Sequence, residues 1–253
     1  MSLATPSPAL VASGPRNRGL AIVLFCLGGF ALGQFIALFT SAIARAASGT
    51  TLSLQYLAAM AEPPWWFIVA TLVGLWIGFL ATTVFVQYRY RVIATERAFR
   101  FELRDLWVVP AAVGLQLAIA VVYSALHVQG TDKPSRHLLG SASGGQLIIL
   151  AGLTIVVVPA IEELFFRGTL LPGLRDLVGS ASVPATAVLA VGLDGILFGL
   201  AHGEWVQLPA LAVVGMVLAW LYWHYGRLWP NYLMHASFNA IGVVVALNVH
   251  STH

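Results

Sequence analysis

Residues 159–168 read PAIEELFFRG and place two adjacent glutamates and an arginine at the end of a long apolar run. The 24 residues from 138 to 161 contain no Asp, Glu, Lys or Arg, and a second long apolar run follows the arginine. A charged side chain in the hydrocarbon core of a membrane costs about 2.5–3.5 kcal/mol on insertion scales. The stretch therefore predicts a membrane-spanning helix in which the fold must compensate for buried charge.

The composition of the whole chain agrees with this prediction. Its 253 residues are 59% hydrophobic and 9% charged, with a mean hydropathy of +0.86, whereas a soluble domain is about 25% charged. The sequence thus predicts an all-α, polytopic transmembrane bundle. Cys26 is the single cysteine, which excludes a disulfide framework and a cysteine-based metal site. No glycine-rich nucleotide-binding pattern occurs, and we expect no nucleic-acid partner.

About seven apolar segments are long enough to cross a membrane. They are residues 20–44, 65–87, 106–127, 145–166, 183–202, 207–224 and 230–248. Residues 46–61 lack charge but are rich in Ser, Thr and Gly, so we expect a loop or an interfacial segment there. Residues 1–19 are predicted to be a disordered tail. The first apolar run is longer than the core of a signal peptide, which favours a retained helix.

The basic residues predict the orientation of the bundle. If the N-terminus is cytoplasmic, ten Lys and Arg residues face the inner side and three, Arg45, Lys133 and Arg136, face the outer side. One span more or fewer would reverse the orientation of the second half of the chain in the membrane. Residues 88–105 are the most charged segment and are expected to form a basic cytoplasmic loop. We divide the rest into N-terminal helices, 20–135, and a C-terminal domain, 136–253.

The acidic pair in the opening stretch separates into two kinds of glutamate. Glu163 and Arg167 are four residues apart, so on a helix they share a face and can pair. Glu162 is turned about 100° away and has no such local partner. A carboxylate without a partner in low-dielectric surroundings suits a general base. The alternative is a structural ion pair at the cytoplasmic end of a helix, with Glu162 reaching interfacial water.

Two further polar sets follow in apolar segments. Residues 198–202 read FGLAH at the end of the fifth span, and residues 235–239 read HASFN early in the seventh. His235 and Asn239 are four residues apart and present their side chains to one helix face. Two hydrogen-bond donors presented together can stabilise a developing oxyanion. A lone intramembrane histidine often only bonds a neighbouring helix, but two histidines, His202 and His235, together with Glu162 favour a functional site.

Glu-Glu-x-x-x-Arg, Phe-x-x-x-His and His-x-x-x-Asn, each on its own apolar helix in this order, resemble the motifs of the CPBP family of intramembrane proteases. This is the CAAX-protease and bacteriocin-processing group, which includes the type II CAAX prenyl endopeptidase. The likeness covers about residues 145–248 and does not involve the first three helices. It implies an abortive-infection-type domain of packed helices that hydrolyses a peptide bond inside the membrane.

The resemblance also implies a role for each motif residue. Glu162 would activate the attacking water with help from His202. His235 and Asn239 would form the oxyanion hole. The remaining motif residues would hold the shape of the site: Glu163, Arg167 and Phe198.

A zinc-dependent version of the same protease stays open. Glu162, His202 and His235 would then be the ligands, with water in the fourth position. The chain has no His-Glu-x-x-His helix, and these ligands would come from three separate elements. We therefore favour catalysis by glutamate and histidine without a metal or another cofactor.

Two other classes of function remain as alternatives. A membrane scaffold or bacteriocin-immunity protein would keep the polar cluster for packing, and solvent access to Glu162 would distinguish it from an enzyme. A secondary transporter would use Glu and His to relay protons, although the chain shows no two-fold repeat. The expected partners are the lipid bilayer and a peptide or membrane-protein substrate, and the expected location is a bacterial plasma membrane. No oligomeric state and no prenylated substrate are predicted.

The fifth predicted span, 183–202, does not fit this site without adjustment. Asp194 within it is expected to orient His202 or to pair with an arginine. Glu162 is expected near the inner end of the fourth span, and a straight helix from residue 183 would place His202 roughly 28 Å from that level. Either the fifth span starts late, near residues 192–195, or it is tilted or broken, or His202 lies outside the site.

Overall fold

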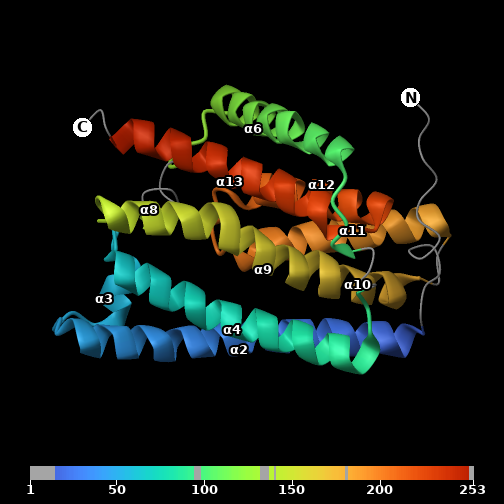
Figure 1. Cartoon of the computed structure of the whole chain (residues 1–253), viewed down its shortest axis with the longest axis horizontal. Coiled ribbons are helices and arrows are strands. Elements are labelled where there is room, and N and C mark those ends of the chain that lie inside the picture. The colour runs from blue at the N-terminus through green and yellow to red at the C-terminus, as the bar shows by residue number, and fades with distance from the viewer. Residues whose placement is uncertain (1–14, 94–97, 132–136, 140, 180–181, 251–253) are drawn as a thin grey trace.

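The protein is described here by a computed structural model, which covers residues 15–250 except 94–97, 132–136, 140 and 180–181, with side chains to residue 247. Over these ranges the chain forms helices, turns and no strand, so the predicted all-helical fold is confirmed (Figure 1). η1 is a 3-10 helix, and η2 and η3 are π-helical turns. The elements are α2 (Arg16–Ser48), α3 (Leu54–Ala59), α4 (Trp65–Tyr90), η1 (Leu103–Trp107), α6 (Val108–Ala125), α8 (Gly145–Gly152), η2 (Leu153–Val157), α9 (Val158–Phe165), η3 (Phe166–Leu170), α10 (Leu171–Val178), α11 (Val183–Ala201), α12 (Leu208–Tyr225) and α13 (Leu228–His250).

Six helical segments in the described part of the chain are long and apolar enough to cross a membrane. They coincide with the first six predicted spans and are Arg16–Ser48, Trp65–Tyr90, Leu103–Ala125, Gly145–Val178, Val183–Ala201 and Leu208–Tyr225. α13 covers the seventh predicted span but is not among the six. The number of spans and the side of the membrane on which the N-terminus lies therefore stay predictions. The predicted tail 1–19 lies mostly outside the described residues, but α2 already begins at Arg16.

The fourth span is longer than the predicted range 145–166. Its helical segments follow one another without a break for 34 residues, from Gly145 to Val178. Pro159 and Pro172 do not end the helix, because each follows a π-helical turn that widens the coil. Glu162 consequently lies at the middle of the segment, 17 residues after its start and 16 before its end. The predicted end of this helix, at residue 166, was therefore wrong by twelve residues.

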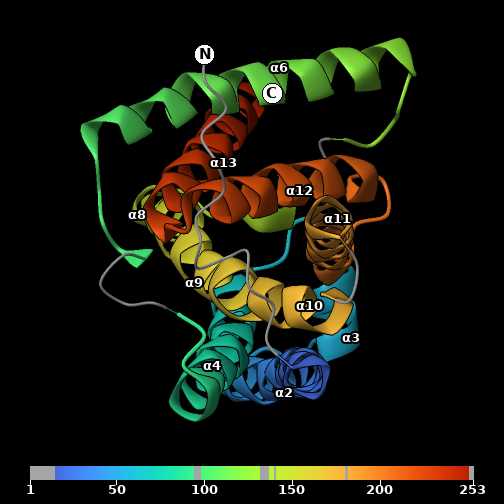
Figure 2. The same cartoon turned by 90° about the vertical axis from the view of Figure 1, so that its right-hand side faces the viewer.

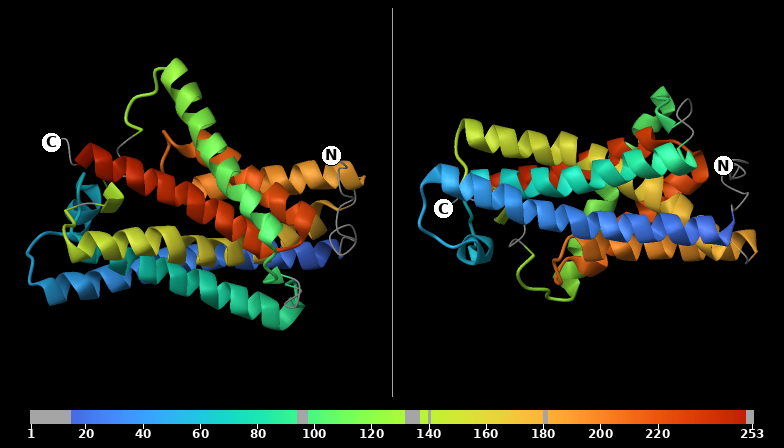
Figure 3. Two further views of the ribbon diagram at one scale, coloured as in Figure 1. Left: turned by 45° about the horizontal axis from the view of Figure 1, so that its top comes forward. Right: turned by 90° about the horizontal axis from the view of Figure 1, so that it is seen from below.

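The longer fourth span also explains why the C-terminal end of the fifth span lies at the level of Glu162. At 1.5 Å per residue the chain rises roughly 24 Å from Glu162 to Val178, and α11 then descends roughly 22 Å from Val183 to Phe198. Phe198 therefore returns to the level of Glu162. α11 is unbroken from its first residue to its last, so no late start or break near residues 192–195 exists. Figure 3 shows α11 beginning at one end of the bundle and ending within it.

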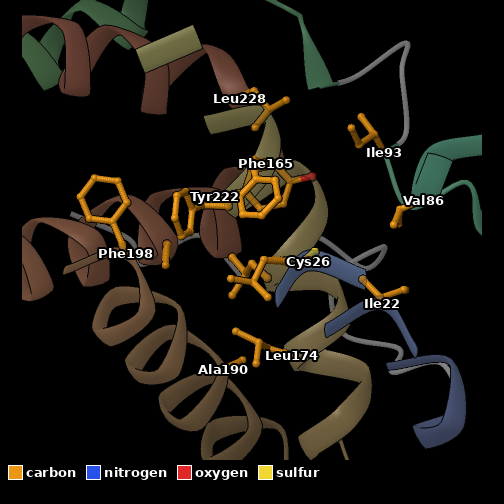
Figure 4. Close-up of a cluster of buried hydrophobic side chains, with 14 of the residues drawn as sticks. Ile22, Cys26, Val86, Ile93, Phe165, Leu174, Ala190, Phe198, Tyr222 and Leu228 are labelled. Carbon is orange, nitrogen blue, oxygen red and sulfur yellow. The ribbon is translucent and has the colours of Figure 1, made fainter. Parts of the chain in front are cut away.

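A row of phenylalanine rings forms the part of the core that leads to the site. Phe79 of α4 stacks on Phe165 with ring centroids 4.0 Å apart. Phe165 meets Phe166 at 5.2 Å, and Phe166 meets Phe198 of α11 at 5.2 Å. Figure 4 shows Phe165 and Phe198 in this cluster, with Tyr222 and Cys26 close to them. The aromatic contacts thus connect α4, in the N-terminal half, with α9 and α11.

The N-terminal helices cover one side of this core. α2 and α4 lie side by side (Figures 1 and 2), and a Cβ added at Gly78 would lie 2.4 Å from Cα of Gly33. α6 lies on the opposite side, outside α12 and α13 (Figure 2). Its far end is held by Tyr123, whose hydroxyl donates to Val206 O at 2.9 Å. Helices outside the three motifs therefore enclose the helices that carry them.

Candidate active site

Glu163 is the acid of the motif that is anchored through one of its carboxylate oxygens. Its Oε1 accepts a hydrogen bond from Nη1 of Arg167 at 3.1 Å and lies 2.9 Å from Nδ1 of His235. Glu163 and Arg167 are 1% and 0% exposed. The ion pair predicted from their spacing is confirmed, and the same carboxylate also connects α9 to α13.

Arg167 is a buried cation with partners on three elements. Its Nη2 donates to Gly215 O of α12 at 2.9 Å, and its Nε lies 3.4 Å from Oδ2 of Asp194 on α11. The guanidinium carbon lies 4.6 Å from the ring centroid of Phe198. Two carboxylates, a carbonyl and an aromatic face compensate for the cost of burying the charge. Asp194 therefore has the arginine partner that was one of its two expected roles.

Glu162 has different surroundings from its neighbour. Its Oε2 lies 3.8 Å from Nε2 of His235, which is beyond hydrogen-bond length but within the range of an ion pair. This oxygen is buried and takes no hydrogen bond from the described residues, although 12% of the side chain is exposed. Glu163 is thus anchored through Oε1, whereas Glu162 has no hydrogen bond from the described residues.

His235 lies between these two carboxylates, with one at each ring nitrogen. The residue is 3% exposed and lies on α13, one turn before Asn239. An ionised carboxylate can only accept, so the 2.9 Å contact with Glu163 places a proton on Nδ1. Nε2 is therefore the nitrogen directed at Glu162 and available for chemistry.

Asn239 reaches the fourth span from α13. Its Nδ2 donates to the main-chain oxygen of Thr154, in η2, at 2.9 Å. The amide group carries a second N–H. Because His235 and Asn239 are one helical turn apart on α13, both predicted oxyanion donors lie against the fourth span.

His202 is a predicted site residue with no ion pair or hydrogen bond to either glutamate. No ion pair within 4.0 Å joins its ring to Glu162 or Glu163. Its ring centroid is instead 4.7 Å from that of Phe198, and the His235 ring lies 5.6 Å from the same Phe198 ring. Phe198 therefore contacts both imidazoles.

The protonation of His202 follows from its hydrogen bond. Nδ1 lies 2.8 Å from the main-chain oxygen of Phe198, one turn earlier in α11. A carbonyl oxygen only accepts, so Nδ1 carries a proton, and in the neutral tautomer with that proton the lone pair is on Nε2. His202 is exposed, unlike His235. Its free nitrogen can accept a proton from water.

The three possible zinc ligands, Glu162, His202 and His235, are not arranged as a metal site in this structure. Among the described residues, no group of three or more His, Cys, Asp or Glu side chains is placed to hold a metal ion. Zinc requires ligand atoms at about 2.0–2.2 Å, and His202 packs against Phe198 without contacting Glu162. As they stand, Glu162, His202 and His235 do not form a zinc site.

Two contributors to the site were not predicted from the sequence. Thr154 and Gly215 take part through their main-chain oxygens, which every residue possesses. The side-chain type therefore gave no signal for Gly215. For Thr154 the only signal was Pro159, which removes a helical donor nearby.

Comparison with known proteins bears directly on this arrangement. A family model described as type II CAAX prenyl endopeptidase Rce1-like matches residues 144–241, a range that holds all three motifs. No curated protein and no solved structure matched the chain. The family supports intramembrane protease activity in general terms, and six apolar helices agree with an integral membrane protein. Residues 144–241 are therefore similar to the type II CAAX prenyl endopeptidase family, the CAAX-protease group to which the three motifs point.

Proposed function

We propose that the protein is an intramembrane endopeptidase in which Glu162 activates water for attack on a peptide bond. The observation that carries this proposal is the contrast between the two adjacent glutamates. Glu163 is held by Arg167 and His235, whereas Oε2 of Glu162 has no hydrogen bond from the described residues and faces Nε2 of His235. Oε2 of Glu163 also lacks a hydrogen bond, but that carboxylate is anchored through Oε1 and its side chain is 2% exposed, against 12% for Glu162. A general base must be free to take a proton from water, and Glu162 is the less restrained and more exposed of the two.

In the proposed reaction Glu162 accepts a proton from water while the water oxygen bonds to the scissile carbonyl carbon. His202 assists as a second acceptor, because its neutral ring has the lone pair on Nε2. Its contribution is expected to be smaller, since it does not contact Glu162. Collapse of the tetrahedral intermediate breaks the C–N bond, and the proton held by Glu162 passes to the leaving amine.

His235 and Asn239 are proposed to stabilise the oxyanion. Nδ1–H of His235 is engaged by Glu163, so donation from Nε2 requires a proton on both nitrogens. The carboxylates on either side of the ring balance that charge. Asn239 contributes the amide N–H that is not bonded to Thr154. Donors fixed in advance in a site that excludes water are the effective kind.

The proposed substrate is a peptide segment or a membrane protein reached from the bilayer or the cytoplasmic side. The proposed location is a bacterial plasma membrane, and the proposed mechanism needs no metal. The description of the matching family contains the word prenyl, but the proposal does not include recognition of a prenylated substrate.

The test is peptidase activity of the purified protein in liposomes on a broad peptide library. Wild type, Glu162→Gln and His235→Ala are assayed together, with and without a zinc chelator. The proposal predicts that both variants lose activity and that the chelator has no effect. Full activity of Glu162→Gln on a confirmed substrate would refute it. Binding of a partner without cleavage, equal in all three proteins, would favour the scaffold alternative.

A further inference from the structure

The π turn η2 leaves one main-chain oxygen without a donor from its own helix. The N–H of Val158 donates to Leu153 O, five residues back, and not to Thr154 O, four residues back. In the same register the next amide would reach Thr154 O, but residue 159 is proline and has no N–H. Thr154 O is therefore left to accept a hydrogen bond from another part of the chain.

That main-chain oxygen is the one to which Asn239 binds, at 2.9 Å from Nδ2. An amide group is planar and carries two N–H bonds on its nitrogen. When one N–H is fixed on Thr154 O, the direction of the other is fixed as well. If the fourth span were a regular helix here, Thr154 O would accept from its own helix, as buried helical carbonyls do.

We infer that Pro159 is a positioning residue for Asn239. By supplying no N–H, Pro159 reserves Thr154 O for the Asn239 amide and so directs its second N–H toward the reacting carbonyl. The inference rests on the oxyanion role proposed above for Asn239. π turns are frequent at functional sites. Here the turn η2, together with Pro159, leaves Thr154 O available to Asn239.

The same helix supplies a matched control thirteen residues later. At the end of η3, the N–H of Leu171 donates to Phe166 O, again five residues back, and Pro172 follows. This second proline likewise removes a donor for Arg167 O. No hydrogen bond from a described side chain to that oxygen is present, and the side-chain bonds of Arg167 are donated by its guanidinium. Pro159 and Pro172 thus share a backbone setting, and only Pro159 leaves an oxygen bound by a site residue.

The kinetic test compares Pro159→Ala, Pro172→Ala, Asn239→Ala and the double variant of Pro159 and Asn239. The N–H of alanine at 159 competes for Thr154 O, so kcat is expected to fall roughly fivefold with KM unchanged. Pro172→Ala is expected to change neither constant. In the Asn239→Ala background the alanine at 159 is expected to have no further effect. Wild-type kcat in Pro159→Ala, or the same fall in both backgrounds, would overturn the inference.

A second measurement needs no substrate and separates this inference from the proposed function. The chain has four asparagines, Asn17, Asn231, Asn239 and Asn248, so its side-chain amide signals are few in protein labelled with 15N-asparagine. The Asn239 signal is the one missing from Asn239→Ala. It is expected to shift in Pro159→Ala and to stay in place in Pro172→Ala. An unmoved signal in Pro159→Ala refutes the inference, whereas full kcat in Asn239→Ala would refute the oxyanion role alone.

Discussion

Arg227 and Asp105 form a two-pronged ion pair that joins the segment before α6 to the start of α13. Nη1 donates to Oδ2 at 2.7 Å and Nη2 to Oδ1 at 2.6 Å, and the side chains are 4% and 2% exposed. Nη1 also donates to Arg100 O at 3.1 Å. Arg227 directly precedes α13, which carries His235 two turns later. A contact between segments 122 residues apart therefore fixes the start of a helix that belongs to the site.

Replacing Asp105 with alanine should strongly destabilise the fold. Removal of one partner from a buried ion pair leaves an unpaired charge, which costs about 3–5 kcal/mol. Thermal unfolding in detergent, followed by intrinsic tryptophan fluorescence, measures the change. Glu102→Gln is the control, because Glu102 lies 3.6 Å from Arg227 and is 20% exposed. The control is expected to change stability by less than about 1 kcal/mol, and equal losses in both variants would contradict the prediction.

Glutamine at the two adjacent glutamates should affect stability at Glu163 but not at Glu162. Glu163→Gln removes a charge from the Arg167 pair and is expected to lower the midpoint of thermal unfolding as well as kcat. Glu162→Gln removes no ion pair with arginine, so its unfolding midpoint should stay close to wild type while kcat falls about 10²- to 10⁴-fold. Unfolding and kinetics measured on the same preparations decide the question. A Glu162→Gln protein as unstable as Glu163→Gln would assign Glu162 a structural role.

Alanine substitutions at two glycines of α11 should distinguish the effect of close helix packing on stability from the effect of helix propensity. A Cβ at Gly195 would lie 2.4 Å from Cγ of Met216 and 2.7 Å from Ala212 O on α12, so Gly195→Ala is expected to cost about 1–3 kcal/mol. Gly192 has no atom within 4 Å of the added Cβ. Gly192→Ala should therefore be neutral or stabilising by up to about 1 kcal/mol. Denaturation midpoints of the two variants should move in different directions, and a loss at residue 192 would refute the packing explanation.

Removal of metal should leave peptidase activity unchanged. The predicted zinc ligands are not placed as a group, since His202 packs on Phe198 without contacting Glu162. Activity after dialysis against a chelator is compared with activity after zinc is added back. Loss on chelation and recovery with zinc would require Glu162, His202 and His235 to move together and would restore the metalloprotease alternative.

The sequence was sufficient to predict the helices but not where one of them ends. Long apolar runs between polar segments identify membrane helices because the bilayer leaves the chain few alternatives. Gly168 and Pro172 looked like the end of the fourth span, since proline usually ends or kinks a helix. Two π turns allow this helix to continue to Val178. The error of twelve residues also produced the apparent conflict over the depth of His202.

Within the site, the sequence predicted contacts along one helix better than contacts between helices. Glu163 and Arg167 pair as their spacing requires. The bond from Glu163 to His235 spans 72 residues, and that from Asn239 to Thr154 spans 85, so both depend on how separate helices pack. An arginine partner was one of the two roles expected for Asp194, but only the packing of α11 against η3 identifies Arg167 as that partner. The catalytic roles themselves stay predictions until the variants are measured.

The length of the fourth span has a consequence for the lipid. The segment from Gly145 to Val178 has 34 residues and α2 has 33, so each is roughly 50 Å long, whereas the hydrocarbon layer of a bilayer is about 30 Å thick. Neither helix can match that thickness without tilting or projecting from it. Such hydrophobic mismatch makes the depth of Glu162 depend on acyl-chain length. If Glu162 has the proposed catalytic role, the thickness of the surrounding membrane is expected to influence which bond of a substrate is level with the carboxylate.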